Sequence, residues 1–135
     1  ADMGIESFLI ASSLEGVIAQ RLVRRICENC KEEIKPSENE KEFIKKHLHI
    51  DKDFKLYRGK GCEQCLNTGY KGRIAIYEIM KIDEDFRSLI SKTTDSKTIR
   101  YYAVKNGMKT LLQDGLRKAV DGITTVEEVL SVAKQ

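Results

Sequence analysis

Four cysteines are the residues whose type and spacing most directly indicate chemistry. Cys27 and Cys30 form one C-x2-C pair, Cys62 and Cys65 form a second, and 31 residues separate the pairs. Each short pair can aim two thiolates at one point while turn amides donate to the sulfurs, so two pairs complete a tetrahedron around Zn²⁺. The spacing therefore predicts a zinc site with these four ligands. Two disulfides or a redox-active thiol pair are the alternatives.

Four sulfur ligands would close the coordination sphere and leave no position for a catalytic water, so the predicted role of the metal is structural. His47 and His49 lie in a charged stretch, and we interpret them as surface residues rather than ligands. The sequence contains neither a G-x-x-x-x-G-K-[ST] phosphate loop nor an H-E-x-x-H motif. It predicts no catalytic residue.

A Zn²⁺ ion bound by four thiolates carries a formal charge of about −2, which needs compensation where it is buried. Six basic residues flank the cysteines in the sequence: Arg24, Arg25, Lys31, Lys60, Lys71 and Arg73. We hypothesise that some of them offset the cluster. The alternative is that all six are ordinary solvated side chains.

Helix caps and apolar spacing predict the elements that carry the cysteines. Leu14, Val17 and Ile18 have helical spacing, which predicts a short helix beginning near Ser12 or Ser13. A strand is favoured over residues 20–26. Residues 31–60 are highly charged and are interpreted as a surface excursion, within which Ser37 and Glu40 form a capping box for a helix to His49.

The sequence after residue 58 predicts turns, a strand and then helices. Gly59, Gly61, Gly69 and Gly72 indicate tight turns around the second cysteine pair. Residues 73–82 (RIAIYEIMKI) are the strongest strand candidate. Caps then predict four tail helices, over residues 83–92, from 95 or 96 to 107, over 110–120, and after Thr125, which forms a capping box with Glu128.

Composition limits the class of protein. The chain has 135 residues, of which 41% are hydrophobic and 33% charged, enough for one ordinary domain or two small ones that share a core. The net charge of +3 is too small to indicate a dedicated polyanion binder. No apolar run exceeds four residues, so we expect no transmembrane helix.

Several separate stretches match one known family in the right order. The first covers residues 4–24, and the second runs from Gly61 through both cysteines to Thr68-Gly69-Tyr70, Gly72-Arg73 and Ile76-Tyr77-Glu78. Further matches are Ile99-Arg100, Gly107-Met108, Thr110-Leu111, Asp114-Gly115 and the run GITTVEE over residues 122–128. Over nearly its whole length the chain resembles the C-terminal part of the motor ATPases of type II secretion and type IV pilus assembly.

That resemblance implies a cytoplasmic ATPase, peripheral to the inner membrane and usually hexameric, that couples hydrolysis of ATP with Mg²⁺ to protein transport or pilin assembly. The implied partners are the other subunits of a homohexamer and an inner-membrane platform protein, with no nucleic acid. The family's phosphate loop lies upstream of the matching region, so the segment alone is not expected to hydrolyse ATP. Its expected role is structural and partner-docking.

The resemblance also implies an α+β layout. Residues 1–26 would be the C-terminal edge of a RecA-like ATPase domain, residues 27–72 a four-cysteine zinc-binding subdomain with a charged insertion, and residues 73–135 a strand with a helical C-terminal subdomain. Arg73 resembles a family arginine that lies close to the nucleotide; alternatively it braces the zinc loop or pairs with an acid. Lys41, Lys45 and Lys46 are candidates for contact with the platform protein.

A freestanding zinc-ribbon nucleic-acid-binding domain is the alternative function. Arg21, Arg24, Arg25 and Arg73 would contact phosphates, and Tyr70 and Tyr77 would stack on bases. This explains a metal site and a basic cluster. It explains neither the long helical tail nor the modest net charge.

Overall fold

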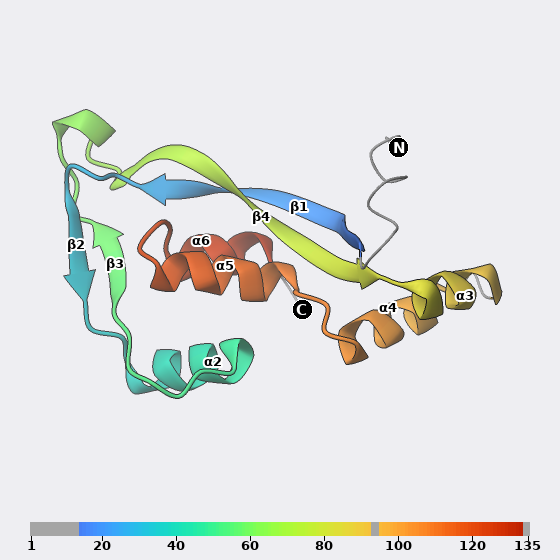
Figure 1. Ribbon diagram of the computed structural model, residues 1–135. Helices are drawn as coiled ribbons and strands as arrows, with labels where there is room; N and C mark the ends of the chain where they lie inside the picture. Colours follow the sequence, from blue (N-terminus) through green and yellow to red (C-terminus); the bar gives the residue numbers. More distant parts are fainter. Residues whose placement is uncertain (1–13, 93–94, 134–135) are drawn as a thin grey trace. The chain divides into compact units, whose positions relative to one another are not determined.

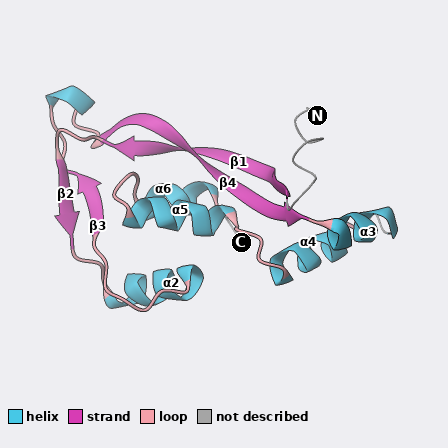
Figure 2. Ribbon diagram, viewed as in Figure 1, coloured by secondary structure: helices cyan, strands magenta, loops and turns pink. Residues whose placement is uncertain are grey.

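The computed structural model of this chain describes residues 14–92 and 95–133 (Figure 1). These residues form an α+β structure with five α-helices and two small sheets (Figure 2). The chain divides into two compact units, one of residues 1–19 and 78–110 and the other of residues 20–77 and 111–135. The boundaries predicted after residues 26 and 72 both fall inside the second unit.

Two long strands, β1 (Leu14–Ile26) and β4 (Tyr70–Ile82), pair in one sheet and run in opposite directions (Figure 1). The strands expected over residues 20–26 and 73–82 are confirmed. The helix expected over Leu14, Val17 and Ile18 is wrong, because β1 already begins at Leu14. A short run of apolar residues with this spacing fits either a helix or a strand. β-branched residues lose little side-chain freedom in a strand that is paired with another. The proposed caps Ser12 and Ser13 lie outside the described residues.

Residues 31–59 form a second sheet and a helix. Strand β2 (Lys31–Ile34) pairs antiparallel with β3 (Leu56–Gly59), with Lys31 opposite Gly59 and Ile34 opposite Leu56. Between them lies α2 (Glu38–Leu48), whose predicted capping box is present: the amide of Glu40 donates to Ser37 Oγ at 3.2 Å and the amide of Ser37 donates to the Glu40 carboxylate at 2.9 Å.

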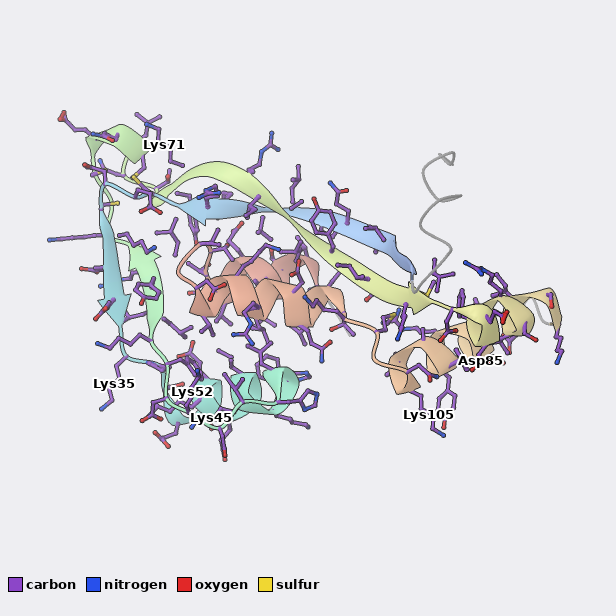
Figure 3. All side chains as sticks on the ribbon, viewed as in Figure 1. Lys35, Lys45, Lys52, Lys71, Asp85 and Lys105 are labelled. Atoms are coloured by element: carbon purple, nitrogen blue, oxygen red, sulfur yellow. The ribbon has the colours of Figure 1, made fainter. Side chains whose placement is uncertain are left out.

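The interpretation of residues 31–60 as a surface excursion is wrong for their apolar face. Ile44 of α2 is fully buried and Leu56 of β3 is 3% exposed, and both belong to the main core. Phe43, Leu48 and Phe54 pack against that core. The charged residues of the stretch, such as Lys35, Lys45 and Lys52 in Figure 3, conceal this amphipathic pattern in the sequence.

The core of the second unit joins these elements to two helices, α5 (Leu111–Val120) and α6 (Val126–Val132). Leu116, Ala119 and Val129 are fully buried. The helices approach closely at Gly115, where an added Cβ would lie 2.5 Å from Val129 Cγ1. A side chain larger than hydrogen therefore does not fit there without displacing α6.

The first unit contains the end of β4, α3 (Glu84–Lys92) and α4 (Ser96–Lys105). Asp83 Oδ1 caps α3 by accepting from the amide of Phe86 at 2.8 Å, and Asp95 caps α4. Phe86, Ala103 and Met108 are buried. All four predicted tail helices are thus present, but they divide between the two units. No described helix has both the length and the hydropathy needed to cross a membrane.

Candidate metal centre

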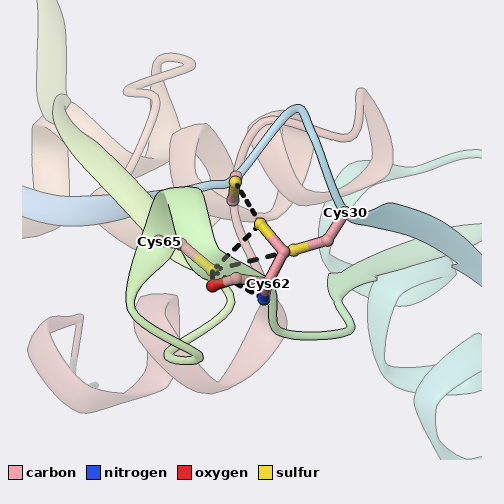
Figure 4. Close-up of side chains that lie close together, drawn as sticks. Cys30, Cys62 and Cys65 are labelled. Carbon is pink, nitrogen blue, oxygen red and sulfur yellow. Dashed lines mark hydrogen bonds between the residues drawn. The ribbon is translucent and has the colours of Figure 1, made fainter.

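The turns between the strands bring the four cysteines together. Cys27 directly follows β1, and Cys30 directly precedes β2. Cys62 directly precedes a single turn of 3-10 helix, η1 (Glu63–Cys65), and Cys65 is its last residue. In Figure 4 the sulfurs of Cys30, Cys62 and Cys65 turn toward one another, and all four Sγ atoms lie within 4.8 Å of one another. Pairs separated by 31 residues in the sequence therefore converge on one point.

The sulfur spacing fits a tetrahedral ion. Zn–S bonds of about 2.3 Å place two sulfurs of a regular tetrahedron about 3.8 Å apart. Sγ separations here are 3.8 Å for Cys27–Cys62 and for Cys30–Cys65 and 3.7 Å for Cys62–Cys65. A disulfide would need about 2.05 Å. The four cysteines are free thiols, and this set could hold a metal ion.

Hydrogen-bond donors contact the sulfurs of Cys30, Cys62 and Cys65. The backbone amide of Gly61 donates to Cys30 Sγ at 3.2 Å, and the amides of Cys62 and Gly69 donate to Cys65 Sγ at 3.3 and 3.2 Å. Asn29 Nδ2 donates to Cys62 Sγ at 3.2 Å. Such donors stabilise negative charge on sulfur, as required of thiolate ligands.

Tight backbone geometry places these amides. Gly61 and Gly69 have φ values of 109° and 84°, in the left-handed region that favours glycine. Leu66 and Asn67 occupy the same region at 55° and 62°, completing the turn after Cys65. The glycines around the second pair thus form the predicted turns.

The surroundings shift the pKa of individual thiols. The Asn29 amide lowers the pKa of Cys62. Burial disfavours ionisation of Cys65, but the amides of Cys62 and Gly69 together with neighbouring thiols lower its pKa to about 6. The Gly61 amide favours the Cys30 thiolate, whereas burial and the other thiols raise its pKa to about 11. The site therefore stabilises some thiolate charge. Four thiolates this close together would repel one another unless a cation were bound between them.

Two of the six flanking basic residues have other partners. Arg24 pairs with Glu128 at 2.8 Å and lies over the ring of Tyr70, 4.1 Å from its centroid. Lys31 lies 3.9 Å from Glu28 and over the ring of Tyr57. Charge compensation by the six remains a hypothesis. The hydrogen bonds to sulfur described above come from backbone amides and from Asn29.

The two histidines lie outside the sulfur cluster. His47 packs on Phe43, with ring centroids 4.6 Å apart, and burial lowers its pKa. His49 is exposed at the end of α2. Neither belongs to the cluster. Arg73 is exposed on β4, so its proposed nucleotide contact stays a prediction.

Sequence reasoning did not identify Asn29 or Glu128 as contributors. Asn29 lies between the first two cysteines, and an amide side chain inside a C-x2-C turn is a usable signal for a sulfur donor. Glu128 was expected only to complete a capping box with Thr125. Its amide does donate to Thr125 Oγ1 at 3.2 Å, but its carboxylate accepts from Arg24, which is distant in sequence.

Comparison with known proteins gives consistent matches. The family described as "Type II/IV secretion system protein" matches residues 1–131. The chain is 46% identical over 130 residues to the type IV pilus assembly ATPase PilB of Thermus thermophilus, covering 96% of this chain and 15% of that protein. It is 42% identical over 136 residues to type II secretion system protein E of Pseudomonas aeruginosa, covering 99% of this chain and 26% of the relative.

A third relative, type II secretion system ATPase E of Vibrio cholerae, is 42% identical over 135 residues, again covering 99% of this chain and 26% of the relative. The chain thus spans between 15% and 26% of the length of these three proteins.

Proposed function

Because this chain belongs to the type II/IV secretion system protein family, we propose that it is the C-terminal, zinc-containing segment of a motor ATPase that powers type II protein secretion or type IV pilus assembly. The parent would be a homohexamer that hydrolyses ATP with Mg²⁺ at the cytoplasmic side of the inner membrane. The segment would contribute structure and a docking surface, and no hydrolysis of its own.

The observation that carries the zinc assignment is the 3.7–3.8 Å spacing of the sulfurs. Cys27, Cys30, Cys62 and Cys65 would be the four ligands of one Zn²⁺, which would supply cross-linking and no catalytic water because its sphere is closed. The stretch from residue 27 to 72 has little core of its own. Besides Cys27 and Cys65, its buried hydrophobic residues are Ile44 and Leu56. A metal cross-link would supply the rigidity that so small a core lacks.

Elemental analysis of the purified chain, combined with thiol titration, tests the assignment. We expect one zinc per chain and four thiols that react under denaturing conditions. Cys65→Ser should lose most of the metal, whereas the exposed Ser91→Ala should retain it. A chain without metal that forms disulfides reversibly would contradict the zinc site and support thiol redox chemistry.

The docking role concerns the exposed side of α2. Lys41 and Lys45 form surface pairs with Glu38 and Asp53, each at 3.5 Å, and such pairs contribute at most about 1 kcal/mol. Exchanging Lys41, Lys45 and Lys46 for Glu should therefore leave the fold intact while weakening binding of the platform protein. Lys105→Glu, on α4, is a single charge-reversal control on another helix, to be compared with each of the three single variants as well as with the triple one (Figure 3). Unchanged binding and assembly by the triple variant would contradict this surface.

The proposed nucleotide contact of Arg73 needs the full-length parent. Arg73→Ala should weaken nucleotide affinity or slow turnover, because a guanidinium pairs with phosphate or stacks on a base. Lys71→Ala, two residues earlier on the same exposed stretch of β4, should change neither. Equal behaviour of the two variants would leave Arg73 a structural residue.

The nucleic-acid alternative is less well supported. Arg24 and Tyr70, two of the side chains it requires, bind Glu128 and Thr125 within the chain. A titration with single- and double-stranded DNA at low salt decides: steeply salt-dependent binding would favour the alternative. We expect no binding.

A further inference from the structure

The edge of β1 that leads to the first cysteine pair is held by the segment that begins α6. The amide of Arg24 donates to Glu128 Oε1 at 2.7 Å, and its carbonyl accepts from Thr124 Oγ1 at 2.7 Å. Two residues later the amide of Ile26 donates to the carbonyl of Ile123 at 2.9 Å. Three consecutive polar groups on this edge are thus satisfied by residues 123–128, immediately before Cys27.

The same segment also holds the strand that leaves the second cysteine pair. Tyr70 Oη and Thr125 Oγ1 are hydrogen-bonded at 2.9 Å. The amide of Tyr70 donates to Thr68 Oγ1 at 3.1 Å, and that hydroxyl lies 2.7 Å from the carbonyl oxygen of Cys65, to which it donates. Tyr70 is thus hydrogen-bonded at its hydroxyl to Thr125 and at its amide to Thr68, which in turn contacts the backbone carbonyl of Cys65.

Arg24 links the end of β1, before the first cysteine pair, to the start of β4, after the second. Its guanidinium donates to Glu128 Oε2 through Nε at 3.1 Å and Nη2 at 2.8 Å, while its face lies over the ring of Tyr70. The Glu128 side chain is only 14% exposed and Thr124 is fully buried, whereas the Arg24 side chain is 53% exposed, so the anchor is buried on the α6 side and open to solvent on the Arg24 side. Charge-assisted, two-pronged contacts of this kind fix orientation as well as contributing energy.

We infer that residues 123–128 form a shared anchor that sets the separation of the two cysteine pairs, with Arg24, Tyr70 and Glu128 as positioning residues for the metal. This inference rests on the proposed zinc site. If zinc binding favours the arrangement in which α6 is docked, docking of α6 must favour zinc binding to the same extent. Metal loading and docking of α6 are therefore thermodynamically linked. Zinc should stabilise α6, and loosening the anchor should weaken zinc binding.

The test compares Glu128→Gln with Glu127→Gln in the complete 135-residue chain. Both changes remove one negative charge from the first turn of α6, but Glu127 is exposed, whereas Glu128 binds Arg24. Zinc affinity is measured by competition with a chromophoric chelator. We expect E128Q to weaken zinc binding about tenfold, at the lower end of the effect of changing a residue that supports a metal ligand, and E127Q to leave it within about twofold.

Hydrogen exchange of the amides of α6, with and without zinc, is the second readout. In the wild-type chain zinc should slow exchange over residues 126–132, and in E128Q this slowing should shrink by the same factor as the affinity. A merely structural role would speed exchange equally with and without metal. Tyr70→Phe, which removes only the hydroxyl that meets Thr125, keeps the test informative if E128Q does not fold; it should weaken zinc binding about threefold.

Three results would overturn the inference, and the first is distinguishable from the other two. A chain that binds no zinc would contradict the metal assignment itself. Zinc binding equal in E127Q and E128Q, or, where E128Q does not fold, equal in wild type and Tyr70→Phe, would leave the metal assignment standing and contradict the anchor. So would exchange over α6 that zinc does not alter.

Discussion

Replacing Gly59 by alanine would place a methyl group where β3 meets the turn that follows Cys65. A Cβ at Gly59 would lie 2.6 Å from both the Cα and the carbonyl carbon of Gly69, and closer still to the carbonyl oxygen. Ordinary van der Waals contact begins at about 3.4 Å, so the backbone of Gly69 must retreat by at least about 0.8 Å, and its carbonyl oxygen by more. No flexible side chain is present at the contact to absorb the movement.

That displacement acts on the sulfurs through Gly69. Its amide donates to Cys65 Sγ at 3.2 Å, and its carbonyl accepts from the amide of Cys27 at 2.9 Å. A metal site tolerates errors of only about 0.2 Å in its distances. Loss of one hydrogen bond to a thiolate and one backbone hydrogen bond costs about 2–4 kcal/mol. If this loss falls on the metal-bound state, zinc affinity drops roughly 30- to 700-fold.

Chelator competition on Gly59→Ala and Gly72→Ala measures the effect. Gly72 also flanks the cysteines, but its φ is 86° and an added Cβ would meet only Arg25 Cδ at 3.6 Å. Alanine there carries a left-handed backbone cost of about 1–2 kcal/mol in fold stability without pushing on the sulfurs. Zinc affinity of G72A should stay within about threefold of wild type. Equal zinc affinity in the two variants would refute the reasoning.

Three further predictions concern the core and the thiols. Gly115→Ala should destabilise the chain by about 1–2 kcal/mol in urea unfolding, because its Cβ collides with Val129, and the same change should cost less when it is made in a Val129→Ala background. Ile44→Ala should lower the free energy of unfolding by about 2–5 kcal/mol, and Ile90→Ala, at an exposed position, by less than about 1 kcal/mol. Equal losses in the two variants would support the interpretation of residues 31–60 as a surface excursion. In the metal-free chain, ultraviolet thiolate absorbance should rise first near pH 6, and Cys65→Ser should remove that step. Because this pKa is lowered on folding, its contribution to stability is complete above pH 9 and is lost as the pH falls through about 6; a first step near pH 9 would contradict it.

Much of the local structure could be predicted from the sequence because the signals are themselves local. Ser37 with Glu40, Asp83 and Asp95 each cap a helix through hydrogen bonds within four residues, and the structure contains all three. The family was also recognisable, since its motifs occur in order along one chain.

Predictions failed where the deciding partner is distant in the sequence. Leu14 belongs to a strand because β4, more than 50 residues later, pairs with β1. Ile44 is buried because α5 and α6 supply the other side of its core, which the charges around it in the sequence do not reveal. Neither partner can be inferred from a window around the residue itself.

The sequence by itself determined which atoms can ligate a metal: four thiols in two short pairs, each confined by its own turn. Only the tertiary structure decided that the two pairs meet and which groups hold them there, because a connection of 31 residues sets no distance between its ends. The distance is set by the β2–β3 pairing on one side and by Arg24, Tyr70 and residues 123–128 on the other. Those contacts join segments up to 104 residues apart, and only folding brings them within hydrogen-bonding range.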